Sequence, residues 1–388
     1  MGKIFCVLGG EEMADYNSSY TGLQIDTAIG KVIDKTVETS ADKVSFIRGS
    51  TGLSANNVQD ALEELAGQSS GGGNSPRTYR VVVGTSTAGW TADDCDYFCT
   101  GSNDQTIISQ AIESLPSTGG VVWFLDGIYN IENTLYIAVD NVTLSGNKKT
   151  SILSNQGSAT MLLAGGSNFS MKDLIIEDKR ASGSGATVVI MGINFRISGC
   201  RFTNLNRLSL SISGQDALLQ DTDFHAAQIT AAIGTHNGAQ VWRCSRTGDE
   251  GNMLPWLQVS GNDINIIGNY VCNAYTGIDT LACQKVNIID NYINSCNIGI
   301  STSGDVIGYN ILNNMILNFI AYGIFTQSMN GQYINVTGNY VALDDALQTP
   351  SGTPIAIAGE RNVITSNITP NKEITTMGSR VLIDNNSY

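Results

Sequence analysis

One short phrase returns through residues 263–341, and its spacing limits the folds that this chain can adopt. The copies read INIIGNYVCNAYTGIDT, VNIIDNYINSCNIGIST, YNILNNMILNFIAYGIFT and INVTGNYV. Apolar residues two apart, such as Ile264 and Ile266, open each copy with the spacing of a β-strand that has one buried face. An Asn, here called the anchor, follows in every copy: Asn269, Asn291, Asn314 and Asn339. A Gly-Ile pair then opens a second strand in three of them, at Gly277, Gly299 and Gly323.

Weaker copies extend the pattern in both directions, with anchors at Cys200, Thr222, Cys244 and Asn367. Successive anchors are 22, 22, 25, 22, 23, 25 and 28 residues apart. A strand-only repeat of this length is typical of one coil of a parallel β-helix. A leucine-rich repeat requires a consensus that these copies lack, and a propeller blade is about 40 residues or longer. We therefore predict an all-β, right-handed parallel β-helix with Cys200 and Cys244 buried in its stack.

Stacking explains why these residue types suit that fold. Equivalent positions in neighbouring coils lie about 4.8 Å apart, so matching apolar residues form continuous interior columns. Stacked Asn side chains bond to one another as an amide ladder, and Asn tolerates left-handed backbone angles at the bend. We expect the anchors to combine both properties. Few charged residues (14%) and 42 glycines also fit a chain of strands and tight turns.

Composition excludes several classes of partner. A net charge of −14 argues against binding to nucleic acid or to an anionic membrane. No apolar run reaches the roughly 18 residues of a membrane span, so no membrane insertion is expected. The first residues do not form a secretory signal, which predicts synthesis in a cytoplasm with the eight cysteines as thiols. No cofactor is predicted, and the Cys95-x-x-x-Cys99 spacing is too weak a signal to predict a metal site.

Four regions are predicted. Residues 1–66 contain two short amphipathic helices that cannot bury their apolar faces alone, so this region is expected to self-associate or dock onto another protein. Residues 67–77, GQSSGGGNSPR, form a flexible linker. Residues 78–343 form the β-helix, closed at its start by a capping helix over 105–115. Residues 344–388 form partial coils.

Two segments carry a resemblance to known families. YTGLQIDTAIGKV and ANNVQDALEELA resemble short repeats near the N-termini of bacteriophage fibre and spike proteins. An acidic turn at Asp93-Asp94, the capping helix, and Gly119-Gly120 through Gly127 and Tyr129 resemble the entry of pectate-lyase-like β-helices. Together they imply a phage tailspike or receptor-binding protein on the virion surface. The resemblance further implies a homotrimer that binds bacterial cell-surface polysaccharide and docks through its N-terminal region onto a baseplate, tail or head protein.

The catalytic patterns of the pectate-lyase-like families are missing, so candidate catalytic residues come from expected geometry. The coil after Cys244 carries a long insertion with Asp249 and Glu250. Asp279, one residue past a buried Ile, is expected to face outward near these acids. Separations of about 5–10 Å are those that retaining and inverting glycosidases use between their two carboxylates. A solvated turn at Asp249-Glu250 and an ordinary outward polar residue at Asp279, stacked with Ser301 and Phe325, are the alternatives.

Aromatic residues near this insertion are candidates for binding sugar rings. Trp256 is expected to be exposed in the insertion, contacting either a glycan or a sister chain, and Tyr275 and Trp242 are expected to add apolar surface. His225 follows the outward Asp223 and is a further binding candidate. Arg243 is expected to pair with Asp221. Ile267, Ile289 and Leu312 face outward in one column, edged by a column of Asn residues, which suggests a contact between subunits.

The leading hypothesis is thus a polysaccharide hydrolase, with Glu250 or Asp249 as general acid and Asp279 activating water or attacking directly. A non-catalytic adhesive fibre of the virion head or tail is the alternative from another class. A third possibility is a lyase in which Tyr275 or His225 acts as the base.

Overall fold

The structure, a computed structural model, describes residues 7–8, 11–12, 59–60, 79–157, 159–180, 185–204, 208–225, 228–230, 238–247, 255–327, 331–343, 352–370, 373–377 and 380–387. The chain divides into two units, Met1–Arg77 and Thr78–Tyr388. In the first, strands β1 (Val7–Leu8) and β2 (Glu11–Glu12) form an antiparallel pair. The linker 67–77 lies outside the described residues, as do the expected N-terminal helices except for residues 59–60.

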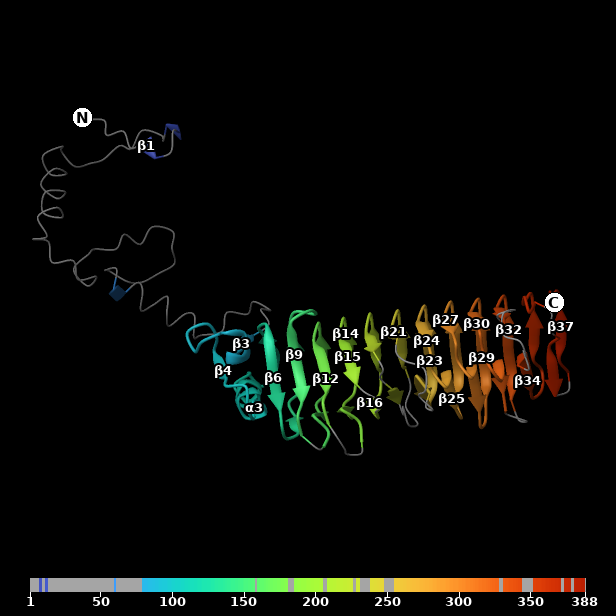
Figure 1. Ribbon diagram of the computed structural model, residues 1–388, viewed down its shortest axis with the longest axis horizontal. Coiled ribbons are helices and arrows are strands. Elements are labelled where there is room, and N and C mark those ends of the chain that lie inside the picture. The colour runs from blue at the N-terminus through green and yellow to red at the C-terminus, as the bar shows by residue number, and fades with distance from the viewer. Residues whose placement is uncertain are drawn as a thin grey trace, which may run out of the picture. The chain divides into compact units, whose positions relative to one another are not determined.

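The unit from Thr78 onward is a right-handed parallel β-helix, which confirms the predicted fold. Each coil gives one strand to each of three parallel sheets, which hold ten, eleven and fourteen strands among the described residues. Figure 1 shows these strands side by side along one axis, with helix α3 at the N-terminal end of the stack. Within a coil, the chain passes from the fourteen-stranded sheet to the ten-stranded and then to the eleven-stranded sheet.

The strands of the three sheets have the following bounds. The ten-stranded sheet contains β6 (Gly127–Ile131), β9 (Ser151–Asn155), β12 (Ile175–Asp178), β15 (Arg201–Asn204), β18 (Asp223–His225), β21 (Ser245–Thr247), β24 (Tyr270–Cys272), β27 (Tyr292–Asn294), β30 (Met315–Leu317) and β33 (Tyr340–Ala342). The eleven-stranded sheet contains β7 (Leu135–Ile137), β10 (Leu162–Ala164), β13 (Val188–Ile190), β16 (Leu208–Ile212), β19 (Gln228–Thr230), β22 (Leu257–Val259), β25 (Thr276–Leu281), β28 (Ile298–Ser303), β31 (Tyr322–Thr326), β34 (Thr353–Ala358) and β36 (Thr375–Met377). The fourteen-stranded sheet contains β3 (Arg80–Thr85), β4 (Tyr97–Cys99), β5 (Gly120–Phe124), β8 (Val142–Ser145), β11 (Ser170–Lys172), β14 (Arg196–Ser198), β17 (Leu218–Gln220), β20 (Gln240–Trp242), β23 (Asn262–Ile267), β26 (Gln284–Ile289), β29 (Ile307–Leu312), β32 (Gln332–Thr337), β35 (Val363–Thr365) and β37 (Leu382–Asp384).

Helix α3 (Gln105–Glu113) packs its apolar side against the first coils. Ile108, Ala111 and Ile112 are buried on it, which confirms the predicted helix and its inward face. Asp104, at the N-cap, is buried and accepts hydrogen bonds from the backbone N–H groups of Gly101 and Asn130. These bonds join the helix to the β6 coil. The helix ends a stack whose first interior residues would otherwise face water.

The anchors form the predicted ladder, which runs further than the sequence phrase suggested. The Nδ2 group of Asn314 donates to Asn339 Oδ1 at 3.0 Å and to the Ile288 carbonyl at 2.9 Å. Its Oδ1 atom accepts from both the backbone N–H and the Nδ2 group of Asn291. All hydrogen-bonding atoms of this buried amide therefore have partners. The same pattern joins a longer run of Asn residues: Asn269, Asn291, Asn314, Asn339, Asn367 and Asn386.

The left-handed backbone lies one residue before each anchor, so its expected location at the Asn was wrong. Asp290 and Asn313 have φ values of 55° and 56°, and Gly268 and Gly338 take the same place in their coils. Because the anchor side chain points inward to join the ladder, the preceding residue makes the turn between the fourteen- and ten-stranded sheets. Gly, Asn and Asp dominate that position because they accept positive φ at little cost.

The Gly-Ile pair also has a steric cause. A Cβ atom on Gly299 would lie 2.5 Å from the carbonyl oxygen of Gly323 and 2.5 Å from a methyl group of Ile316. Gly277 and Gly323 face the same obstruction from the next coil. These glycines let the inward branched residues of the ten-stranded sheet pack against the backbone of the eleven-stranded sheet.

Substituting Gly299 with Ala should therefore strongly destabilise the chain. A contact of 2.5 Å with backbone cannot be relieved by a rotamer change, and overpacking of this kind typically costs about 3 kcal/mol. The matched control is Gly165→Ala, because its added Cβ meets no atom within 4 Å and should change the free energy of unfolding by about 0.5 kcal/mol or less. Urea titrations followed by circular dichroism compare the two. Equal midpoints would refute the steric explanation.

Removing a buried Asn of the ladder should lower the free energy of unfolding far more than removing an Asn at the surface. Asn314→Ala removes the partner of the buried Asn291 N–H and Nδ2 groups and one bond to the Ile288 carbonyl, which should lower the free energy of unfolding by about 3–5 kcal/mol. Asn310→Ala removes a half-exposed amide bonded at 2.8 Å to Asn287, where water replaces the lost bond. We expect about 1 kcal/mol or less there. Thermal and urea unfolding of both variants measure this difference.

Candidate functional site

The residues singled out in the sequence fall on all three outer faces of the β-helix. His225 lies on β18 of the ten-stranded sheet, Asp279 on β25 of the eleven-stranded sheet and Trp242 on β20 of the fourteen-stranded sheet. Side chains on different sheets of a coil point in different directions away from the axis. The structure therefore does not bring these candidates together into one site.

Asp279 faces outward, as predicted, between the buried Ile278 and Thr280. It pairs in register with Ser301, whose own partner is Phe325, so the expected column is confirmed. Gln258 Nε2 donates to the Asp279 carboxylate at 2.9 Å. The carboxylate is thus half-buried and hydrogen-bonded on the eleven-stranded sheet.

Tyr275 is 41% exposed and directly precedes β25, at the corner between the ten- and eleven-stranded sheets. The expected surface position of this ring is therefore confirmed. Trp242 is half-buried on the fourteen-stranded sheet, in register with Ile267. Its indole Nε1 is buried and has no hydrogen-bond partner among the described residues.

The expectation of an exposed Trp256 was wrong, because its side chain is fully buried. Its backbone N–H donates to the Thr276 carbonyl at 2.8 Å, so the residue joins the eleven-stranded sheet and not the insertion. Leu257, the next residue, pairs with Ile278, and the indole therefore occupies the place in the stack that Gly277 takes one coil later. Trp256 is an interior residue with no surface for a sugar or a sister chain.

The two proposed acids of the insertion, Asp249 and Glu250, lie outside the described residues. Their predicted distance to Asp279 stays a prediction. Thr247, two residues before Asp249, ends β21 and is the last described residue before them.

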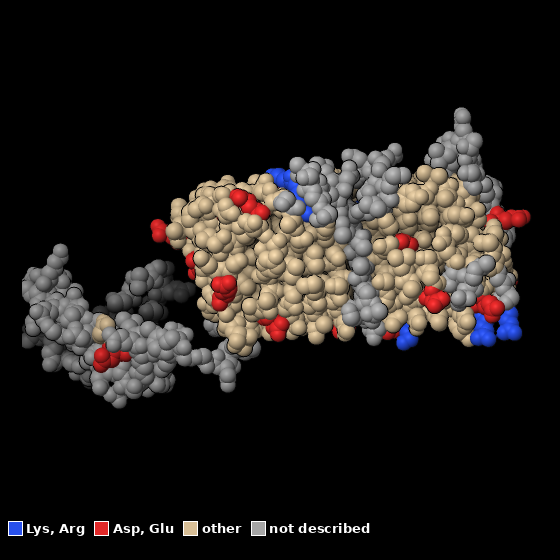
Figure 2. All heavy atoms as spheres, turned by 90° about the horizontal axis from the view of Figure 1, so that it is seen from below, with Lys and Arg blue, Asp and Glu red and all other residues tan. Residues whose placement is uncertain are grey.

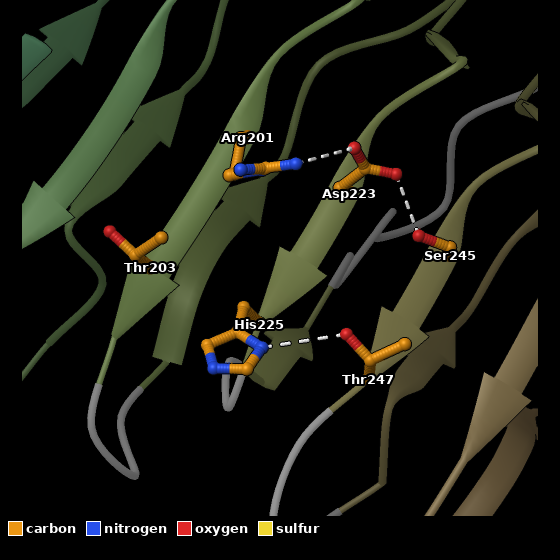
Figure 3. Close-up of a pocket in the computed structure, with 6 residues that line it drawn as sticks. All are labelled: Arg201, Thr203, Asp223, His225, Ser245 and Thr247. Carbon is orange, nitrogen blue, oxygen red and sulfur yellow. Dashed lines mark hydrogen bonds and ion pairs between the residues drawn. The ribbon is translucent and has the colours of Figure 1, made fainter. Parts of the chain in front are cut away.

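A pocket of about 420 Å³ lies on the outer face of the ten-stranded sheet. This volume falls within the range of small-molecule sites. Figure 3 shows its side chains in two rows that cross three neighbouring strands, β15, β18 and β21. The lining residues are Arg201, Thr203, Asp223, His225, Ser245 and Thr247.

Asp223 is at the centre of the first row. Ser245 Oγ donates to its Oδ1 atom at 2.7 Å, and Arg201 Nη2 lies 3.8 Å from its Oδ2 atom. Lys148, from the turn between β8 and β9, reaches the same Oδ2 atom at 3.9 Å. In the second row, His225 Nδ1 lies 3.4 Å from Thr247 Oγ1. The pocket thus offers hydroxyl, imidazole, carboxylate and cationic groups on one open surface.

A stripe of mainly aromatic residues, exposed or half-buried, continues from this pocket along the same sheet. We define it by Tyr270, Tyr292, Met315 and Tyr340, which pair with one another in successive coils. Ser245 of the pocket pairs with Tyr270 at its start. The Tyr270 and Tyr292 rings are parallel, with centroids 5.0 Å apart. Tyr270 is 46% exposed and Met315 44%, so the stripe presents apolar surface to solvent.

Arg201 and the stripe were not predicted from the sequence, although the repeated phrase contains the signal for both. Each stripe residue directly follows an anchor and directly precedes a buried apolar residue, as Tyr270 does between Asn269 and Val271. Alternation along a strand requires such a residue to face outward. The same position holds Arg201, Asp223 and Ser245 in the earlier coils.

Charged residues are sparse on the face that Figure 2 shows, where most of the described surface is neither acidic nor basic.

The expected ion pair between Arg243 and Asp221, at the corner between the fourteen- and ten-stranded sheets, is confirmed. Arg243 Nε and Nη2 donate to the two carboxylate oxygens of Asp221 at 2.7 and 2.8 Å, and these bonds lower the pKa of Asp221. Cys200 and Cys244 are buried as expected, and burial raises the pKa of both thiols to about 12. Neither thiol is a nucleophile at neutral pH.

Of the helices in the described ranges, none has the length and apolarity to cross a bilayer. Within those ranges, no group of three or more His, Cys, Asp or Glu side chains is placed to hold a metal ion.

Comparisons with known proteins identify the fold. No protein-family model and no curated protein matches the sequence. An exopolygalacturonase from Thermotoga maritima has a TM-score of 0.55 at 9% identity, covering 83% of this chain and 96% of its own. The surface adhesin PfbA of Streptococcus pneumoniae scores 0.54 at 11% identity, with coverages of 73% and 94%. The Dettilon tailspike protein scores 0.46 at 14% identity, with coverages of 92% and 73%. The chain is thus a parallel β-solenoid whose structural neighbours include polygalacturonase, adhesin and tailspike proteins.

Proposed function

We propose that this chain is a bacteriophage tailspike or receptor-binding protein that binds a bacterial surface polysaccharide along the outer face of the ten-stranded sheet. The resemblance of its N-terminal segments to phage fibre and spike proteins supports the phage role. That resemblance also supports a homotrimeric assembly, attachment through residues 1–66 to a baseplate, tail or head protein, and a location on the virion surface.

The observation that carries the binding proposal is the continuity of the pocket and the stripe. Both lie on one sheet, and the column from Arg201 to Tyr340 passes through seven successive strands. Six strand spacings correspond to about 29 Å. A surface of this length, with hydroxyl and cationic groups at one end and aromatic rings beyond, suits an extended chain of sugars. Polar groups bond to hydroxyls, and rings cover the apolar faces of the sugars.

The hydrolytic activity that we propose assigns Glu250 or Asp249 as general acid and Asp279 as the carboxylate that activates water or attacks. Asp249 and Glu250 follow the pocket residue Thr247 by two and three positions in the sequence.

A specific observation favours the alternative of a non-catalytic adhesive fibre. Among the described lining residues, Asp223 is the one carboxylate, and it is already bonded to Ser245, whereas a glycosidase needs two.

Removing the stripe rings should weaken glycan binding without affecting the fold. Tyr270→Ala and Tyr340→Ala each remove exposed ring surface, and each should lower the affinity for host capsule or cell-wall glycan about fivefold to tenfold. The control is Tyr136→Ala, because Tyr136 is 67% exposed on the eleven-stranded sheet. Affinity electrophoresis in gels containing the host glycan measures all three. Equal retention of the Tyr136 and Tyr270 variants would place the binding surface elsewhere.

Glu250→Gln and Asp249→Asn separate an enzyme from an adhesin. Hydrolysis predicts that one of them reduces the release of reducing ends from host glycan at least about a hundredfold while binding persists. Asp263→Asn is the control, because Asp263 lies on the fourteen-stranded sheet 3.5 Å from Lys285. If the wild-type chain binds its glycan and releases no reducing ends, the hydrolase proposal fails. Products that absorb in the ultraviolet would instead indicate a lyase, with His225 or Tyr275 as the base.

A further inference from the structure

Arg201, Lys148 and Arg246 place an excess of positive charge at the pocket. Across the whole chain, acidic residues outnumber basic residues by 35 to 21. Arg201 and Lys148 nevertheless converge on the single carboxylate of Asp223. His225 lines the same pocket. Among the described residues at the pocket, the balance of charge is therefore opposite to that of the chain.

The contacts of Arg201 and Lys148 with Asp223 leave hydrogen-bond donors available. Their nitrogen atoms lie 3.8 and 3.9 Å from the carboxylate oxygen, beyond the range of a hydrogen bond. Other ion pairs among the described residues vary: Arg243 and Asp221 make two bonds of 2.7 and 2.8 Å, whereas Lys172 lies 4.0 Å from Asp173 and Lys285 lies 3.5 Å from Asp263. Lys179 and Glu177, on the coil before Arg201, approach to 2.9 Å. The pocket differs from these pairs because two cations share one carboxylate there and neither forms a hydrogen bond with it.

A buried cation lies beneath the pocket. Arg246 is the inward residue of β21, between the two pocket residues Ser245 and Thr247, and is 1% exposed. Its guanidinium donates to the Cys272 carbonyl, and no carboxylate of the described part of the chain forms an ion pair with it. Burial lowers the pKa of this guanidinium, yet arginine stays charged at neutral pH. In the weakly polarisable interior its charge is poorly screened and adds positive potential at the surface above it.

From these contacts we propose that the pocket binds an anionic substituent of a sugar ring, a carboxylate or a phosphate. Arg201 and Lys148 hold the anion through the donors that Asp223 leaves free. This inference rests on the proposed polysaccharide function and names the chemical class of its ligand. Charge-assisted bonds of this kind are about twice as strong as neutral ones, so the pocket distinguishes charged from neutral sugars.

The chain provides its own reporter for the test. It contains two histidines, His225 and His236, so ring signals of the full-length protein labelled with carbon-13 histidine are assignable with a His236→Gln variant. Glucuronate, glucose 6-phosphate and glucose are titrated as probes. We expect saturable shifts of the His225 signals with one or both anions and none with glucose at equal concentration. Glucuronate alone indicates a carboxylate site, and glucose 6-phosphate alone indicates a phosphate site.

Three variants test the assignment of charges. Arg201→Gln should weaken anion binding about tenfold, whereas Arg196→Gln, an exposed change on the fourteen-stranded sheet, should have no effect. Asp223→Asn keeps a group that accepts from Ser245 and removes the competing charge, so it should tighten anion binding about threefold. Higher salt should weaken binding in every case.

Several outcomes overturn the inference: equal shifts with glucose, no shift with either anion, or unchanged affinity in Arg201→Gln. The proposed function fails separately. If host glycan is retained and retention depends on Tyr270 while the anions do not bind, the ligand is a neutral polysaccharide and the receptor-binding proposal stands. If host glycan is not retained at all, the proposed function fails whatever the small probes show.

Discussion

The structure depends on hydrogen bonding between equivalent residues stacked one coil apart. At the corner between the fourteen- and ten-stranded sheets, each buried Asn of the ladder bonds to the Asn of the next coil and to the backbone of the coil before it. A buried amide that lacks these partners lowers the free energy of unfolding by more than several surface contacts raise it. A shift of one coil against the next would break these bonds, so the ladder fixes the register of successive coils. Because the preceding residue takes the left-handed conformation, the ladder also fixes the direction in which the ten-stranded sheet begins.

That direction determines where the candidate site lies. The residue after each anchor is the first outward residue of the ten-stranded sheet, and in successive coils it is Arg201, Asp223, Ser245, Tyr270, Tyr292, Met315 and Tyr340. One position of the repeated phrase therefore supplies both the polar pocket and the aromatic stripe. The position two residues later supplies Thr203, His225 and Thr247 to the same pocket. A substitution at either position changes the outer surface and leaves the Asn ladder intact. Surface residues of a solenoid can therefore form a site without lowering the stability of the fold.

The fold was predictable from the sequence because the same pattern of apolar, Asn and Gly residues recurs in many coils. Strand spacing, buried anchors and the pairing of Arg243 with Asp221 followed from the repeat, and the helical spacing of residues 105–115 predicted the capping helix. The site was harder to predict because candidates were chosen for conspicuous chemistry near an insertion, and not for their column in the stack. Trp256 shows the difference: its neighbour Leu257 is in register with Ile278, and that register places the indole inside. The left-handed position was missed because the intrinsic preference of Asn for such angles competes with its use in the ladder, and burial of the amide decides in favour of the ladder.

The shape of the sheet bears on whether the chain is an enzyme or an adhesin. Outward side chains of one parallel sheet leave it in nearly the same direction, so they form an extended surface for a long ligand but do not converge on a single bond. A glycosidase needs two carboxylates on opposite sides of the bond that breaks. On a β-helix, groups that approach from the side come from the corners between sheets. Asp223 stands on the flat face, whereas Thr247 ends its strand at the corner where Asp249 and Glu250 follow in the sequence. The flat face suits the proposed binding of a long glycan, and the proposed hydrolysis requires Asp249 or Glu250.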